Sequence, residues 1–104
     1  MRTIKEDTVK EAIDFYGANI QATICMEECA ELIQCISKEI RGKSNIDHLA
    51  EEMADVCICI EALKQIYGIS DEQMQFWIDF KQKRIEDRML KGGITYDHSN
   101  DSAR

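Results

Sequence analysis

Apolar residues recur along this chain at the three- and four-residue spacing of amphipathic helices, and glycines divide it into segments of helical length. No stretch alternates apolar and polar residues over any length, so no strand is predicted. The spacing predicts helices over residues 4–16 or 6–16, over 18–41, over 46–67, and from a capping-box serine, Ser70, to about residue 90. We therefore expect an all-α protein whose protomer is a four-helix bundle.

The predicted third helix is apolar over more than one face. Leu49, Met53 and Val56 share one side, and Ile58 adds a second. A helix with that much apolar circumference is central in its bundle or packs against another subunit. Because a chain of 104 residues buries only a modest core, we expect a homodimer or a homotetramer built as a dimer of dimers.

Length, charge and cysteine content limit the classes of function that this protein can have. The length fits one domain, predicted over residues 1–92 and followed by a polar tail at 93–104. A formal charge of −7 argues against binding to a nucleic-acid polymer. No apolar run approaches the roughly 20 residues of a membrane span, and the N-terminal residues lack the apolar core of a signal peptide. Five cysteines without a CxxC pair predict small core side chains in a reducing compartment, so we expect a cytoplasmic protein.

Two carboxylate pairs interrupt this otherwise ordinary pattern. Glu28 and Glu31 share a helix stripe with apolar residues, and so do Glu52 and Asp55, whereas Glu27 points about 100° away from Glu28. The alternative for a lone ExxE motif is a solvated acidic face. Two such motifs within apolar stripes disfavour that alternative, because desolvated carboxylates without cations are very costly.

The spacing of each pair suits a hard cation. Carboxylates three residues apart on a helix lie about 5–6 Å apart at Cβ, and two pairs on neighbouring antiparallel helices can surround one or two ions. Ligation by oxygen alone selects Mg²⁺ or Mn²⁺. Because Mg²⁺ keeps positions open for water and phosphate oxygens, the predicted ligand is a polyphosphate.

Glu27-Glu28-x-x-Glu31, a spacer, and Glu52-x-x-Asp55 together resemble the signature of the MazG-type all-α nucleoside triphosphate pyrophosphohydrolases. The resemblance covers about residues 17–90. It implies Mg²⁺-dependent hydrolysis of a nucleoside or deoxynucleoside triphosphate to the monophosphate and pyrophosphate, with Mn²⁺ as a substitute. It also implies that Glu28, Glu31, Glu52 and Asp55 hold the metal, and that Glu27 holds a second metal or orients the attacking water; a solvated Glu27 stays an alternative.

The phosphates also need protein cations. Lys81, Arg84 and Arg88 lie on one face late in the predicted fourth helix, and Lys83 points elsewhere. They resemble the basic run with which the last long helix of the family contacts phosphate. The alternative is that these basic side chains are solvated and occur near the C-terminal end of the helix because the helix dipole favours positive charge there.

Three further residues have weaker signals. Gln21 is in line with the acidic stripe and is a candidate contact to a base or to a ligated water, but an ordinary amide at the core edge explains it equally well. His48 lies one turn before Glu52. We favour packing at the start of the helix, or a hydrogen bond to a residue that holds the metal, over direct ligation of the metal by His48. Trp77 is expected in the core, with base stacking as the alternative.

Two other function classes compete with the hydrolase. One is a non-catalytic or regulatory helical bundle that keeps the acids for structure. The other is a di-iron carboxylate bundle, but that architecture uses Glu-x-x-His pairs, and the second partner in both motifs here is an acid. We expect a nucleoside triphosphate as the partner, and neither a membrane nor a nucleic-acid polymer.

Overall fold

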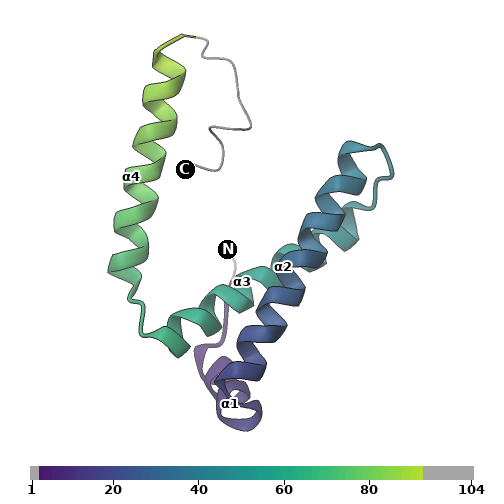
Figure 1. Ribbon diagram of the computed structural model, residues 1–104, viewed down its shortest axis with the longest axis vertical. Helices are drawn as coiled ribbons and strands as arrows, with labels where there is room; N and C mark the ends of the chain where they lie inside the picture. The colour runs from purple at the N-terminus through teal and green to yellow at the C-terminus, as the bar shows by residue number, and fades with distance from the viewer. Residues whose placement is uncertain (1–2, 93–104) are drawn as a thin grey trace. The chain divides into compact units, whose positions relative to one another are not determined.

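The structure, a computed structural model, describes residues 3–92 and contains four α-helices, with no strand among those residues (Figure 1). They are α1 (Glu6–Tyr16), α2 (Ala18–Ile40), α3 (Ile46–Tyr67) and α4 (Asp71–Leu90). The all-α class and all four predicted helices are confirmed, with bounds within two residues of those expected. The polar tail predicted at 93–104 lies outside the described residues.

Local capping chemistry fixes the ends of α3 and the start of α4. The Asn45 side chain accepts a hydrogen bond from the His48 backbone N–H at 3.1 Å and so caps α3. Gly68 ends that helix in the left-handed conformation, at φ 65°, which glycine adopts without steric cost. The predicted capping box of Ser70 and Gln73 then opens α4, with both of its reciprocal hydrogen bonds formed.

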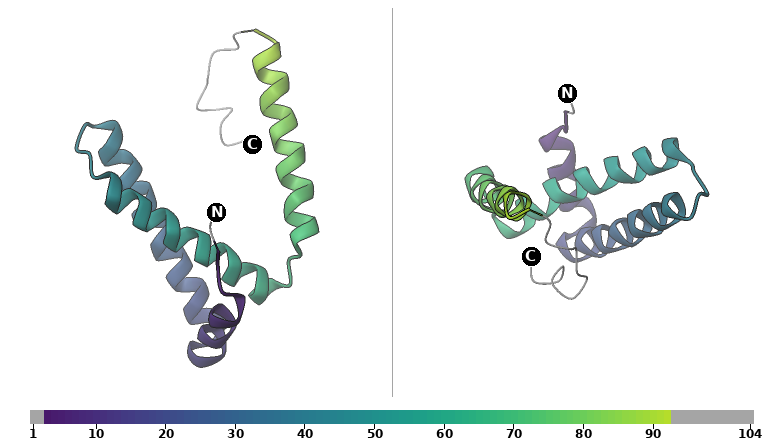
Figure 2. Two further views of the ribbon diagram at one scale, coloured as in Figure 1. Left: turned by 180° about the vertical axis from the view of Figure 1, so that it is seen from behind. Right: turned by 90° about the horizontal axis from the view of Figure 1, so that it is seen from above.

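Helices α1, α2 and α3 belong to one compact unit, Met1–Gly68. Figures 1 and 2 show α2 and α3 lying side by side as an antiparallel hairpin, and α1 contacts both of them. The core of this unit consists of small side chains: Val9, Cys25, Cys59 and Ala62. The Cys25 thiol donates to the carbonyl of Cys59 at 3.6 Å, so the two long helices approach closely at this point.

Three of the five cysteines behave as the predicted core side chains. Cys25, Cys35 and Cys59 are buried, Cys57 is half-buried, and all five thiols are free. Cys29 is exposed, so the prediction was wrong for that residue. It lies one turn beyond Cys25, on a part of α2 that the neighbouring helices leave open.

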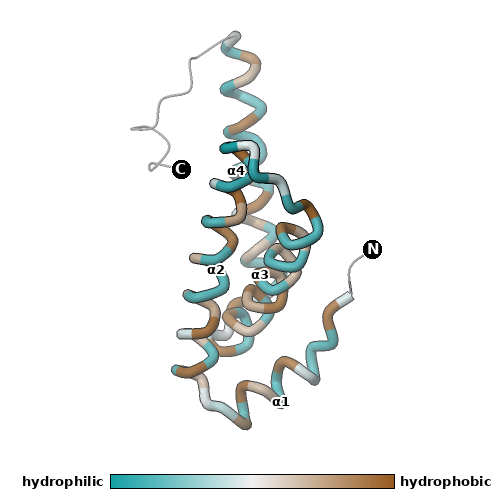
Figure 3. The backbone as a smooth tube through the Cα atoms, turned by 90° about the vertical axis from the view of Figure 1, so that its right-hand side faces the viewer, coloured by the Kyte–Doolittle hydropathy of each residue, from teal (hydrophilic) through white to brown (hydrophobic). Residues whose placement is uncertain are grey.

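Many large apolar side chains of the first unit are exposed. Phe15 is 80% exposed, Ile33 67% and Ile40 82%, and no large side chain among the described residues is fully buried. Figure 3 shows how hydrophobic positions recur around α2 and α3. The described residues of this unit therefore leave much of their apolar surface exposed.

The second unit, Ile69–Arg104, contains α4. An edge-to-face row of aromatic rings runs along α4, from Phe76 to Trp77 at 5.2 Å between centroids and from Trp77 to Phe80 at 5.7 Å. Trp77 is 53% exposed and no residue of α4 is buried, so the predicted core role of Trp77 is not met within this chain. One amphipathic helix cannot bury its own apolar face.

None of the helices in the described part of the chain is long and apolar enough to cross a membrane.

Candidate functional site

The α2–α3 hairpin brings the predicted acids together. One carboxylate oxygen each from Glu28, Glu31 and Glu52 lies within 4.8 Å of the other two. Asp55, the fourth predicted acid, hydrogen-bonds the Glu28 carboxyl group. Residues from two helices thus form one cluster of four acids, which we call the acidic cluster.

The antiparallel direction of the two helices decides how the four acids pair. Glu28, the first acid of its motif, meets Asp55, the second acid of the other, and Glu31 meets Glu52 in the same crossed manner. Two carboxyl groups can share a hydrogen bond only if one of them carries a proton. Without a cation, the proximity of the acids therefore favours the protonated form of Glu28 and Glu52 over that of an ordinary carboxyl group.

Burial is uneven across the acidic cluster. Glu52 is 4% exposed, and its Oε1 atom is buried without a hydrogen-bond partner. Glu28 and Asp55 are half-buried, whereas Glu31 is exposed. Glu52 is therefore the desolvated member of the acidic cluster, and Glu31 is the member open to solvent.

The pKa of two acids is raised by this arrangement. The hydrogen bond that protonated Glu28 donates to Asp55, burial, and the negative charges of Asp55, Glu52 and Glu31 raise the pKa of Glu28 to about 7. For Glu52, burial is the largest cause of its raised pKa, followed by the hydrogen bond with Glu31, and the nearby His48 opposes the rise. Two of the four acids thus ionise less readily than ordinary carboxyl groups.

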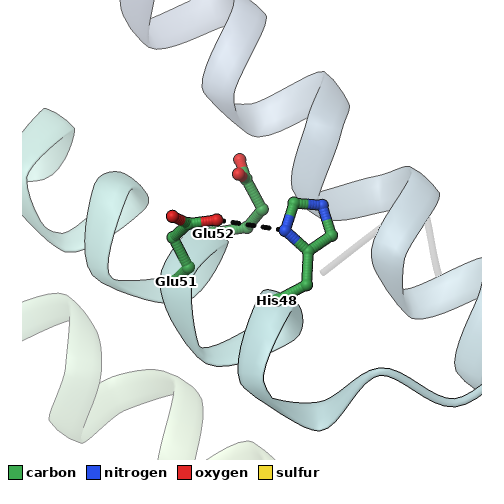
Figure 4. Close-up of side chains that lie close together, drawn as sticks. All are labelled: His48, Glu51 and Glu52. Carbon is green, nitrogen blue, oxygen red and sulfur yellow. Dashed lines mark hydrogen bonds and ion pairs between the residues drawn. The ribbon is translucent and has the colours of Figure 1, made fainter.

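A second group of side chains adjoins the acidic cluster on α3. His48 Nδ1 and Glu51 Oε1 are 3.1 Å apart, so the two side chains pair on one face of α3 (Figure 4). One ligand atom each from His48, Glu51 and Glu52 lies within 4.8 Å of the others. Sequence reasoning missed Glu51; its signal was the spacing of three residues from His48, which places both on one helix face.

The remaining predicted residues of α2 lie at the edge of this site. Glu27 is exposed, next to Glu28 but outside the group of three acids whose oxygens converge. Gln21 is half-buried and lies seven residues before Glu28, about 10 Å along the helix axis. At that distance the Gln21 side chain lies outside the acidic cluster, and its role in binding a ligand remains a prediction.

The predicted basic residues lie on α4, in the second unit. Lys81 is exposed, and Arg84 and Arg88 are half-buried. The Arg84 guanidinium lies 5.9 Å from the centroid of the Phe80 ring, and Lys83 pairs with Asp87 at 2.6 Å. The role of Lys81, Arg84 and Arg88 in binding phosphate remains a prediction.

Comparisons of the chain with protein-family models, with curated proteins and with solved structures found no match.

Proposed function

We propose that this protein is a Mg²⁺-dependent nucleotide pyrophosphohydrolase of the MazG-like type, which cleaves a nucleoside or deoxynucleoside triphosphate between the α- and β-phosphates. The products are the nucleoside monophosphate and pyrophosphate. The motif resemblance supplies the reaction, and the acidic cluster supplies the physical support for it.

The observation that carries the proposal is the buried, unpartnered Oε1 atom of Glu52 in the acidic cluster. A buried polar atom without a partner is costly, and a carboxylate even more so. A divalent cation would compensate Glu52 and, with it, the charges of Glu28 and Glu31, whose oxygens lie within 4.8 Å. The donor set consists of carboxylate oxygens, which suits Mg²⁺ or Mn²⁺.

Glu28, Glu31, Glu52 and Asp55 would hold the metal. When bound, Mg²⁺ would neutralise phosphate charge and lower the pKa of a coordinated water. Glu27, exposed and one residue from Glu28, is the proposed base that takes a proton from the attacking water. Lys81, Arg84 and Arg88 are proposed to neutralise the departing pyrophosphate, and Gln21 to contact the nucleoside end.

The exposed apolar surface supports a further element of the proposal, an assembly of two or four copies. A bundle that buries only small core residues leaves side chains such as Phe15 and Ile40 to be covered by another copy. Sedimentation equilibrium measures this directly. We expect a homodimer or homotetramer, and a monomer at micromolar concentration would refute the assembly but not the chemistry.

The test of the activity is a pyrophosphate assay with a panel of canonical, deoxy and modified nucleoside triphosphates in Mg²⁺. We expect stoichiometric pyrophosphate and monophosphate without orthophosphate. Glu31→Gln should abolish turnover, because it removes an exposed ligand of the cluster without opening a core cavity. Glu11→Gln is the matched control, an exposed acid of α1 outside the cluster, and should keep full activity.

The same preparation separates the hydrolase from a non-catalytic bundle. If Mg²⁺ stabilises the protein but no triphosphate of the panel is cleaved, the acids bind a cation without catalysis, and the enzymatic proposal is wrong. If Mg²⁺ has no effect on stability either, the cation site itself is wrong.

A further inference from the structure

We propose that His48, Glu51 and Glu52 form a second cation site, specific for a borderline transition-metal ion of the Zn²⁺, Co²⁺ or Ni²⁺ type, which shares the Glu52 carboxylate with the acidic cluster. This inference goes beyond the proposed function. It does not require that a nucleotide be hydrolysed.

Convergence of ligand atoms is the first observation. Each of the three residues offers one atom within 4.8 Å of the other two, and His48 Nδ1 already lies 3.1 Å from Glu51 Oε1. Metal–nitrogen and metal–oxygen bonds of roughly 2.0–2.2 Å place two ligands of one tetrahedral ion roughly 3.3–3.6 Å apart. The group therefore has to contract by at most roughly 1.5 Å, and the exposed side chain of Glu51 is free to make that movement.

The burial of Glu52, the carboxylate that both groups share, is the second observation. Its side chain is 4% exposed with Oε1 unpartnered, and it points from α3 toward α2 beside His48 (Figure 4). Glu52 belongs to both groups of converging ligands, the one with Glu28 and Glu31 and the one with His48 and Glu51. A carboxylate has two oxygens, so Glu52 can bind one cation on each side.

Hydrogen bonds to the end of α2 fix the backbone that carries the second site. The Glu39 carboxylate accepts a hydrogen bond from the Asn45 backbone N–H at 2.6 Å, and the Asn45 side chain in turn caps the His48 N–H at 3.1 Å. These two bonds anchor the first turn of α3 to the end of α2. The backbone of His48 is thus fixed, and only side-chain rotamers need to adjust when an ion binds.

The donor set decides the selectivity. Imidazole nitrogen suits Zn²⁺, Ni²⁺, Cu²⁺ and Fe²⁺, whereas Mg²⁺ prefers oxygen alone. The positive end of the α3 dipole opposes any cation in this first turn, and the charges of Glu51 and Glu52 offset it. The two sites would therefore discriminate: Mg²⁺ among the acids of α2 and α3, and a transition-metal ion at the imidazole.

The test uses the full chain, treated with a chelator, saturated with excess Mg²⁺ and titrated with Co²⁺. We expect one equivalent of Co²⁺ to remain bound by equilibrium dialysis, with visible d–d absorption and without the near-ultraviolet band of thiolate ligation. His48→Gln should weaken Co²⁺ binding by at least about tenfold, and Glu51→Gln serves as a second variant at another exposed ligand. Equal far-ultraviolet circular dichroism establishes that each variant is folded.

The matched control is His98→Gln, which removes the other histidine of the chain and should leave the Co²⁺ isotherm unchanged. Unchanged binding in both His48→Gln and Glu51→Gln, displacement of Co²⁺ by Mg²⁺, or a thiolate band would each overturn the site. Glu31→Gln should keep Co²⁺ while losing turnover. Because no nucleotide is present in the titration, failure of this site and failure of the hydrolase are distinguishable.

Discussion

Replacing Glu52 by glutamine should stabilise the metal-free protein and abolish its response to Mg²⁺. Glutamine keeps the size of the side chain but removes a charge that burial disfavours, as the raised pKa of Glu52 indicates. The new amide can also donate a hydrogen bond to Glu31, the present neighbour of Glu52. Both changes favour the folded state when no cation is bound.

The size of the effect follows from burial. Glu52 is 4% exposed and has one unpartnered oxygen, and relieving one buried unpartnered group is comparable to gaining a hydrogen bond. For a domain of this size, a gain in stability equal to one hydrogen bond should raise the melting temperature of the metal-free variant by roughly 4–8 °C. In the wild type, Mg²⁺ at about 100 times its Kd should add about 2.7 kcal/mol of stability, and the variant should lose most of that gain.

The assay is thermal unfolding of both proteins at pH 8, with chelator and with Mg²⁺. Repeating it at acidic pH provides the internal control, because the raised pKa of Glu52 favours its protonation there and the wild-type curve should approach that of the variant. A Glu52→Gln protein that is less stable than the wild type without metal, or that keeps the full Mg²⁺ shift, would refute the reasoning.

Three further predictions concern titration, thiols and the core. The metal-free protein should lose stability as pH rises from about 4.5 to about 7, because the raised pKa of Glu28 keeps a proton on the folded state that the unfolded state has released. Chemical denaturation measures this, and a free energy of unfolding that increases over the same pH range would contradict the prediction. Exposed Cys29 should react with a disulfide reagent faster than buried Cys59, whose pKa burial raises to about 12, and Cys29→Ser should remove that fast phase. Val9→Ala should cost about 1–2 kcal/mol of unfolding free energy, whereas exposed Thr8→Ala should cost far less.

Much of the fold was predictable because helix formation is local. Apolar spacing, glycines at helix ends and the Ser70 capping box gave all four helices with nearly correct bounds. The pairing of Glu28 with Glu31 and of Glu52 with Asp55 on common faces follows from the same periodicity. The core position predicted for Trp77 on α4 depended on a partner surface, which no property of the helix itself specifies.

The sequence by itself determined that four acids lie on the apolar faces of two helices, because that depends only on helical periodicity. Only the tertiary structure decided that Glu28 meets Asp55, that Glu31 meets Glu52, and that Glu52 alone is deeply buried. A helical wheel treats the four acids as equivalent, since it contains no register between helices. The register is set by the antiparallel hairpin and the close approach at Cys25 and Cys59, and the unequal desolvation of the acids follows from it.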